Sequence, residues 1–384
     1  MSPAAHNTSV FIDTSSALDQ ALVRIGQSDR LALDLEADGL HHYQEQLSLI
    51  QIALDNGAIF LIDPLAEIEL GGIKGVLEYK QLVIHDGAYD IRLLFKALGS
   101  LPEFTLFDTL QGARILGETN FGLGALVQAH TNIALEKANQ KADWSRRPLP
   151  PDMLEYAAND VRYLLRIADD QTDQLDQHDR LVWHQQSSAD VKNSALANEP
   201  EREKRGWRKL KGAGKIKLHE IKFVEAVWHW RDKRASERDV PPYRIMSNEL
   251  VLALGVWTAN NPGLSLQHGP RLPRNLKGNR LVVLTKVLKN AANQPDPTDD
   301  GRKKHIRPER NYKLEQQISK IRVMGATIAD EAGLDPSFFA PKNRIIAIVQ
   351  NLPKSMDDII DGGYLLPWQI ELLRPAFEKV LFGE

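Results

Sequence analysis

One short segment, residues 30–38 (RLALDLEAD), restricts the possible folds of this chain most strongly. Leucines and acidic residues alternate in it, and in a β-strand alternate side chains point to opposite faces. The leucines therefore share one face, and Asp34 and Glu36 share the other. Two neighbouring carboxylates that are buried repel each other and need a cation to stay ionised, whereas a solvated pair does not. The rest of the chain decides between these alternatives.

Strand-like and helix-like segments are mixed over the first half of the chain. Short apolar runs bounded by turn residues predict strands, and apolar residues three and four apart predict helices. The predicted strands are 9–13, 30–38, 47–54, 58–63, 80–86 and 104–109; the predicted helices are 16–27, 71–79 and 87–99, with mostly helical chain up to about residue 180. This order predicts an α/β domain over 1–185, built as a mixed sheet flanked by helices.

Further domains are expected, because 384 residues exceed what one hydrophobic core usually serves. Residues 186–212 are polar and predict a linker. Two helical regions, 213–292 and 309–384, follow it, with a second predicted linker at 293–308. The sequence therefore predicts an α/β domain followed by two all-α bundles.

Charge is distributed unevenly along the chain. Residues 1–200 hold 15 Lys and Arg against 29 Asp and Glu, whereas residues 201–384 hold 33 against 22. The basic half predicts a polyanionic partner. The alternative is that these charges are solvated surface residues that bind no partner. The absence of cysteine excludes disulfides, thiolate metal ligands and a cysteine nucleophile. With no secretory signal and no apolar run of about 20 residues, we expect a cytoplasmic location and no membrane contact.

Two further segments place acidic residues on predicted helices. Asp90 lies in the first turns of a helix that follows a strand, and Tyr156 and Asp160 are four residues apart, so they share a helix face. Together with Asp34 and Glu36, these acids could supply the oxygen ligands that Mg²⁺ or Mn²⁺ prefers. Two such ions about 3.5–4 Å apart can activate a water and stabilise the leaving oxygen in an attack on a phosphodiester. Tyr156 could orient that water.

Three segments carry a family resemblance: ALDLEADGLHHYQEQLSLIQIA, LVIHDGAYDIRLLF and PLPPDMLEYAANDVRYLL. In this order they resemble the exonuclease motifs of the DEDD superfamily, with the Tyr-x-x-x-Asp spacing of its DEDDy branch, and residues 8–180 look like the ribonuclease D family. The resemblance implies an RNase H-like fold, two divalent cations and 3′→5′ hydrolysis that releases nucleoside monophosphates. It implies that the metal ligands are Asp34, Glu36, Asp90 and Asp160, and that Tyr156 positions the attacking water.

Four nearby residues each have a structural and a functional interpretation. His85 matches a histidine common in the second motif, and a strand-end structural role is equally compatible with its position. Gln51 could approach the acidic site, although a structural hydrogen bond is favoured. Trp144 could stack on a base, although packing is favoured. Asp108 is interpreted as a helix cap rather than as a further acid of the site.

The region after residue 200 interleaves aromatic and basic side chains. Residues 201–240 hold 13 Lys and Arg against 7 Asp and Glu, which would attract phosphates. Trp228 and Trp230 diverge by about 200° on a helix, so at least one is expected in the core, and an exposed one could stack on an unpaired base. The candidate RNA contacts are Arg146, Arg147, Lys209, Lys211, Trp228, Arg231 and Arg234.

The segment LHEIKFVEAVWHWRDKRASERDVPPYRIMSNELVLALG is similar to the HRDC domain, a small helical bundle shared by RecQ-type helicases and ribonuclease D. Residues 309–384 resemble a more diverged second copy. One exonuclease domain and two HRDC domains is the arrangement that the ribonuclease D resemblance implies.

These features predict a metal-dependent 3′→5′ exoribonuclease that trims structured RNA such as tRNA precursors. The helical domains would hold the folded RNA while the acidic site receives its single-stranded 3′ end. Two alternatives stay open. A DNA exonuclease of the proofreading type would use the same acids, because they contact phosphate. A non-catalytic RNA-binding or docking protein would not need the intact acidic set. A monomer is expected.

Overall fold

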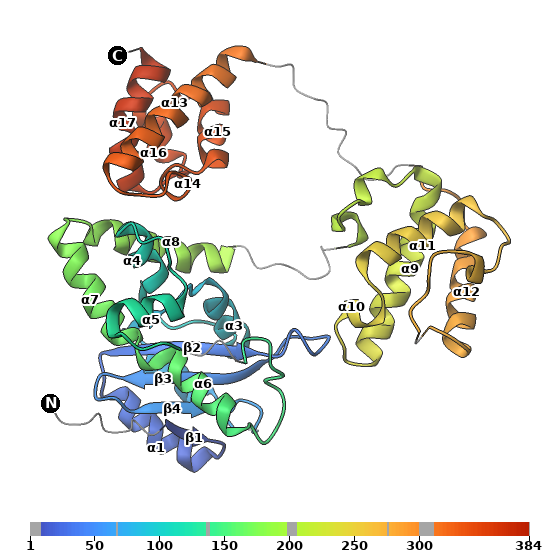
Figure 1. The fold of residues 1–384 in the computed structure, drawn as a ribbon, viewed down its shortest axis with the longest axis horizontal. Helices are drawn as coiled ribbons and strands as arrows, with labels where there is room; N and C mark the ends of the chain where they lie inside the picture. The colour runs from blue at the N-terminus through green and yellow to red at the C-terminus, as the bar shows by residue number, and fades with distance from the viewer. Residues whose placement is uncertain are drawn as a thin grey trace. The chain divides into compact units, whose positions relative to one another are not determined.

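The computed structural model describes residues 9–66, 68–135, 139–197, 206–274, 276–298 and 311–383. The chain divides into two compact units (Figure 1). Unit 1 comprises residues 1–37, 47–198 and 307–384, and unit 2 comprises residues 38–46 and 199–306. Among the helices of the described ranges, none has the length and apolar character needed to cross a membrane.

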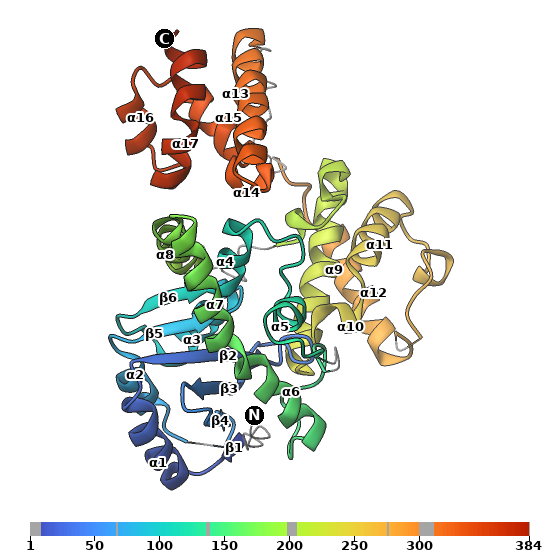
Figure 2. The same ribbon diagram turned by 60° about the vertical axis from the view of Figure 1, so that its left-hand side comes forward.

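Unit 1 contains a six-stranded mixed sheet with the order β1-β4-β3-β2-β5-β6 (Figure 2). The pairs β2–β3 and β3–β4 are antiparallel, and the other three pairs are parallel. The strands are β1 (Ser9–Ile12), β2 (Arg30–Ala37), β3 (Leu47–Leu54), β4 (Ile59–Ile62), β5 (Gln81–Ile84) and β6 (Thr105–Asp108). All six strands were predicted at these places, and the mixed sheet is confirmed.

Helices cover both faces of the sheet, so each face has its own hydrophobic core. They are α1 (Ser15–Gly26), α2 (Gly71–Leu77), α3 (Ala88–Leu98), α4 (Thr109–Ile115), α5 (Leu123–Thr131), α6 (Pro151–Arg162), α7 (Leu164–Gln177) and α8 (Leu181–Ala197). One core joins α1, α2 and α3 to Leu31, Leu33 and Leu35 of β2. The other joins α6 and α7 to Ala32 of β2 and to Leu49 and Ala53 of β3. The alternation in 30–38 therefore divides β2 between the two cores. The leucines share one face and pack in a core, as the sequence predicted.

The predicted linker at 186–212 is wrong in its first part, because helix α8 occupies residues 181–197. Residues up to Ala197 are helical, so the first domain extends beyond 185. Few large apolar residues mark this helix because polar side chains occupy much of its buried face: His184, Ser187 and Ser188 are all buried. The His184 ring nitrogen Nε2 hydrogen-bonds to the backbone oxygen of Asp108, and Ser188 Oγ accepts from the Asp108 amide. The predicted linker residues 198–205 and 299–308 lie outside the described part of the chain.

The C-terminal helices belong to unit 1 and pack on α8. They are α13 (Tyr312–Glu331), α14 (Pro336–Phe339), α15 (Lys342–Gln350), α16 (Met356–Asp361) and α17 (Pro367–Phe377), followed by a π-helical turn at Glu378–Phe382. Trp368 of α17 stacks on Trp183 of α8, with ring centroids 4.9 Å apart. Its indole Nε1 also donates to Ser187 Oγ at 3.2 Å. The helical nature predicted for 309–384 is confirmed within its described residues.

Unit 2 is a helical bundle. Its elements are the short turns Trp207–Lys209, Ala213–Lys215 and Leu266–His268, and the helices α9 (Leu218–Glu237), α10 (Pro242–Ile245), α11 (Asn248–Asn260) and α12 (Asn279–Ala292). Helix α9 packs against α10, α11 and α12. Within the same unit, the Tyr43 hydroxyl donates to Asp232 at 2.7 Å. Trp230 is buried and Trp228 is half-buried, which confirms that at least one of the pair lies in the core.

Candidate active site

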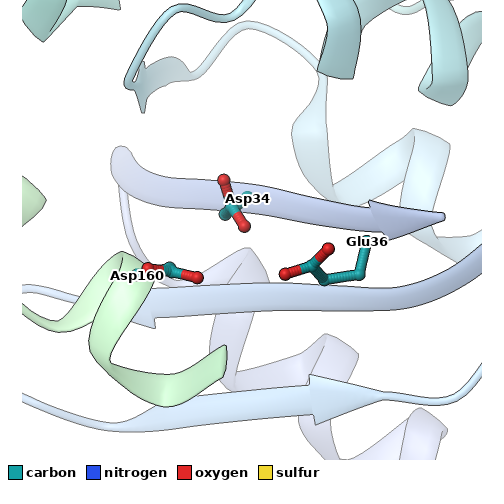
Figure 3. Close-up of side chains that lie close together, drawn as sticks. All are labelled: Asp34, Glu36 and Asp160. Carbon is teal, nitrogen blue, oxygen red and sulfur yellow. The ribbon is translucent and has the colours of Figure 1, made fainter. Parts of the chain in front are cut away.

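Strand β2 places Asp34 and Glu36 on the face of the sheet that α6 covers. Helix α6 packs on β2, β3 and β4 and brings Asp160 to the same place. Each of the three half-buried carboxylates offers one oxygen, and these oxygens all lie within 4.8 Å of one another. Figure 3 shows the three side chains converging on one space between the helix and the strands. The acidic face of residues 30–38 is therefore partly covered by protein rather than fully exposed to water.

Two features fix α6 in this position. The helix begins at Pro151, whose restricted backbone suits a first turn, and Ala157, Ala158 and Val161 bury its inner face. Ahead of it, the Arg147 guanidinium donates to the Asp63 carboxylate and to the backbone oxygens of Ser48 and Trp144. The segment leading into α6 is thus tied to the sheet. Sequence reasoning missed this use of Arg147, because Asp63 is 84 residues away.

Asp90 enters the site from the first turn of α3. It is 6% exposed, and its Oδ1 accepts from the backbone amide of Leu35 at 3.1 Å. Leu35 lies between Asp34 and Glu36 in β2, so this bond brings the fourth acid to the strand that carries the first two. Asp90 is not part of the three-carboxylate group, but its charge affects the pKa of both Glu36 and Asp160.

The turn before Asp90 is held by Asp108, the residue interpreted as a helix cap. Its fully buried carboxylate accepts from the backbone amides of Asp86 and Gly87 ahead of α3, and from those of Leu110 and Gln111 at the start of α4. The predicted capping role is confirmed. Asp86 has a positive φ of 57°, which is unusual for a residue with a side chain, and the bond from its amide to Asp108 helps to hold it there.

All four acidic residues have raised pKa values, so without a cation the folded protein favours their protonated forms. Burial raises the pKa of Asp34 and of Asp90 well above the ordinary value, and the nearby carboxylates raise it further. Burial, and then the charges of the other acids, raises the pKa of Glu36 to about 10, and burial raises that of Asp160 to about 7. A divalent cation would remove this penalty by neutralising the carboxylates. An all-oxygen donor set of this kind fits Mg²⁺ or Mn²⁺.

Tyr156 lies one turn before Asp160 on α6 and hydrogen-bonds to its carboxylate, which lowers the pKa of Asp160. Burial, followed by the charges of Asp160 and Glu36, raises the pKa of the Tyr156 hydroxyl above its ordinary value. The phenol therefore stays protonated at neutral pH and can serve as a hydrogen-bond donor and acceptor, not as a base.

Three other residues from the sequence analysis lie in or near this part of the fold. The His85 ring nitrogen Nδ1 hydrogen-bonds to Thr109 Oγ1 at 2.9 Å, and burial lowers the pKa of His85 to about 4, so the ring is neutral. Trp144 is 1% exposed and packs in the core under α6, its ring centroid 6.1 Å from that of Tyr156, so the favoured packing role is confirmed. Gln51 is fully buried and its carboxamide has no hydrogen-bond partner among the described residues, so the favoured structural hydrogen bond is absent there.

The candidate RNA-contact residues differ in solvent exposure and in the intramolecular hydrogen bonds that their side chains make. Arg146, Lys209 and Lys211 are exposed. Arg234 is half-buried and donates to Glu237 at 2.7 Å. Arg231 is 4% exposed and donates to the backbone oxygen of Met246 and to the Asn248 side chain, so it holds the bundle together, as Arg147 holds the segment before α6.

Comparisons with known proteins match both units. A sequence model of the 3′-5′ exonuclease family matches residues 9–176, and one of the HRDC domain matches residues 220–255. A ribonuclease D of Xanthomonas oryzae pv. oryzae is 31% identical over 282 residues, which are 71% of this chain and 73% of that protein. A ribonuclease D of Desulfotalea psychrophila is 24% identical over 376 residues, 96% and 97% of the two chains.

Solved structures share the fold. The crystal structure of a Bifidobacterium adolescentis protein has a TM-score of 0.81 at 22% identity and covers 97% of both chains. That of Escherichia coli RNase D has a TM-score of 0.66 at 21% identity and covers 97% of this chain and 99% of the other. At these identities the likeness establishes the architecture, including the RNase H-like sheet with its flanking helices.

Proposed function

This chain belongs to the ribonuclease D family of 3′-5′ exoribonucleases, and we propose that it trims the single-stranded 3′ ends of structured RNAs, tRNA precursors among them. The observation that carries the proposal is the group of Asp34, Glu36 and Asp160 carboxylates within 4.8 Å of one another, on a fold shared with ribonucleases D. The E. coli relative is named as an exoribonuclease involved in structured RNA processing, which supports the substrate class.

Two divalent cations, Mg²⁺ or Mn²⁺, complete the proposed site. Asp34, Glu36, Asp90 and Asp160 would hold them, and when bound they would lower the pKa of a water and stabilise the leaving 3′ oxygen. The residues of this chain supply the rest of the chemistry. The Tyr156 hydroxyl, anchored by Asp160, orients the attacking water, and the closed packing of α6 on the sheet keeps the acidic group rigid.

Unit 2 is proposed to bind the folded body of the RNA. It contains the matched HRDC segment, and Lys209 and Lys211 present exposed ammonium groups just before it. Such contacts neutralise phosphates without reading sequence, so the affinity for RNA would fall steeply with salt. Because Arg231 and Arg147 are committed to intramolecular bonds, the proposal assigns RNA contact first to Lys209, Lys211 and the exposed Arg146. The enzyme is proposed to act as a monomer.

The test uses a 5′-labelled tRNA-like RNA with a short 3′ extension, with Mg²⁺ or Mn²⁺, and a DNA of matching sequence beside it. We expect a ladder that shortens from the 3′ end of the RNA, abolished by EDTA and by Asp34→Asn. Asp173→Asn, at an exposed carboxylate on α7, is the matched control and should cleave normally. Equal digestion of the DNA would favour the proofreading-type alternative, and cleavage that persists in EDTA would refute the metal site.

A further inference from the structure

Gln51 is a buried polar residue that the chemistry described so far does not use. It lies in the middle of β3, a strand whose residues are all buried, and in the antiparallel pair with β2 its partner is Asp34. Residues directly opposite in such a pair point to the same face of the sheet, with Cβ atoms about 4.5–5.5 Å apart. Gln51 therefore lies beside Asp34, on the face that α6 covers.

The carboxamide of Gln51 has no hydrogen-bond partner. The residue is 0% exposed, and neither its Oε1 nor its Nε2 is bonded to any described group. Burying an unpaired carboxamide destabilises a protein, and leucine or isoleucine, which fill most of this strand, would avoid that loss. The polar side chain thus costs stability in the metal-free protein, and an interaction in the loaded site would account for its presence.

The hydrogen bonds of the other acids point to the partner. Among the described residues, Asp90 accepts from the Leu35 amide and Asp160 accepts from Tyr156, whereas no hydrogen bond reaches the Asp34 carboxylate. The residue opposite Glu36 is Leu49, whose side chain has no hydrogen-bond donor. Within the described part of the chain, the Gln51 carboxamide, whose NH₂ has no acceptor, therefore lies opposite the Asp34 carboxylate, which has no donor.

We infer that Gln51 is a positioning residue for Asp34: its side-chain NH₂ donates to the Asp34 carboxylate in the metal-loaded site. This inference rests on the proposed metal site and names a residue that supports it. Such a bond fixes which carboxylate oxygen faces the cation and limits rotation of the side chain. Supporting hydrogen bonds of this kind change metal affinity by about 10–100-fold when removed.

The test compares Gln51→Leu and Gln51→Met with wild type, because leucine and the unbranched methionine fill the same space without a donor. Ile52→Val, a buried change on the opposite face of β3, is the control for packing. We would measure Mn²⁺ affinity by calorimetry at pH 7.5, the melting temperature of the EDTA-treated protein, and kcat and KM for RNA. Both Gln51 variants should raise the Kd for Mn²⁺ about 10-fold or more, lower kcat with little change in KM, and leave the metal-free melting temperature unchanged or higher.

Two results would overturn the inference: a Kd for Mn²⁺ within twofold of wild type in either variant, or a metal-free melting temperature that falls further than in Ile52→Val. The second result would mean that Gln51 supports packing in general. Asp34→Asn separates this inference from the proposed function. If Asp34→Asn abolishes metal binding and cleavage while the Gln51 variants behave as wild type, only the role of Gln51 fails. If Asp34→Asn itself binds Mn²⁺ and cleaves normally, the metal site fails.

Discussion

Asp90 and Leu35 are joined by a hydrogen bond from the Leu35 amide to the Asp90 carboxylate, 3.1 Å long and buried. The bond links the first turn of α3 to the point in β2 midway between Asp34 and Glu36. It therefore holds close together acids from two elements, although Leu35 and Asp90 are 55 residues apart in the sequence. It also fixes the orientation of the Asp90 carboxylate relative to the strand.

Two substitutions of Asp90 should separate the effect of its negative charge on cleavage from the effect of its hydrogen bond on stability. Asp90→Asn keeps an oxygen that can accept from Leu35 but removes the negative charge, so cleavage should fall by about 10²–10³-fold with the melting temperature nearly unchanged. Asp90→Ala also leaves the buried Leu35 amide unpaired and should cost about 1–3 kcal/mol of unfolding free energy. Urea unfolding and RNA cleavage on both variants check this. Equal stability of the two variants would contradict the role given to the bond.

The stability of the metal-free protein should fall as pH rises. In the folded state the pKa of Asp160 is raised to about 7 and that of Glu36 to about 10, whereas unfolded carboxyls titrate near pH 4. The folded state therefore holds these protons more tightly, so the contribution of the two groups to stability is fully present below about pH 4 and is lost progressively as pH rises toward 7 for Asp160 and toward 10 for Glu36. Urea unfolding in EDTA at pH 5, 7 and 9 measures this.

Two comparisons make the pH prediction specific. Glu36→Gln should show a weaker loss of stability toward pH 9, because it removes one of the groups that must ionise. Saturating Mn²⁺ should also weaken the pH dependence in wild type, since bound cations favour the ionised carboxylates. An identical pH profile for wild type and Glu36→Gln would show that the acids do not share one buried site.

Tyr156→Phe should affect turnover more than metal binding. The hydroxyl bonds to Asp160 and would orient the attacking water, so its removal should lower kcat by about 10²-fold. The carboxylates remain, and Mn²⁺ affinity should change far less than kcat. Tyr79→Phe, at a tyrosine that is 82% exposed, is the control. A loss of metal affinity as large as the loss of kcat would assign Tyr156 to metal binding instead.

Asp108→Asn should weaken both the fold and the site. The Asp108 carboxylate accepts four backbone hydrogen bonds, and an asparagine would turn an NH₂ toward some of those amides. Leaving buried amides unpaired should cost about 1–3 kcal/mol, measured by urea unfolding. Because two of the bonds hold the turn before α3, cleavage should fall as well. Full activity in Asp108→Asn would show that this turn tolerates movement without displacing Asp90.

The sequence predicted those parts of the site that local periodicity reveals. Alternation identified β2 and the shared face of Asp34 and Glu36, and helical spacing identified Tyr156 with Asp160. Hydrogen bonds between residues far apart in the sequence could not be predicted in this way. No local sequence pattern indicates that Arg147 bonds to Asp63, or that Asp90 accepts from Leu35. Helix α8 was missed because buried polar residues such as His184 and Ser188 resemble linker composition and find their partners only in the folded protein.

Unit 1 is assembled from both sides of the segment that forms most of unit 2. The stack of Trp183 on Trp368 joins chain that precedes residue 199 to chain that follows residue 306. Cutting the backbone once between those positions would therefore leave the two fragments of unit 1 associated by their packing. The entropy of closing such a loop also grows only slowly with its length. The length of the segment 199–306 should accordingly have only a small effect on the stability of unit 1.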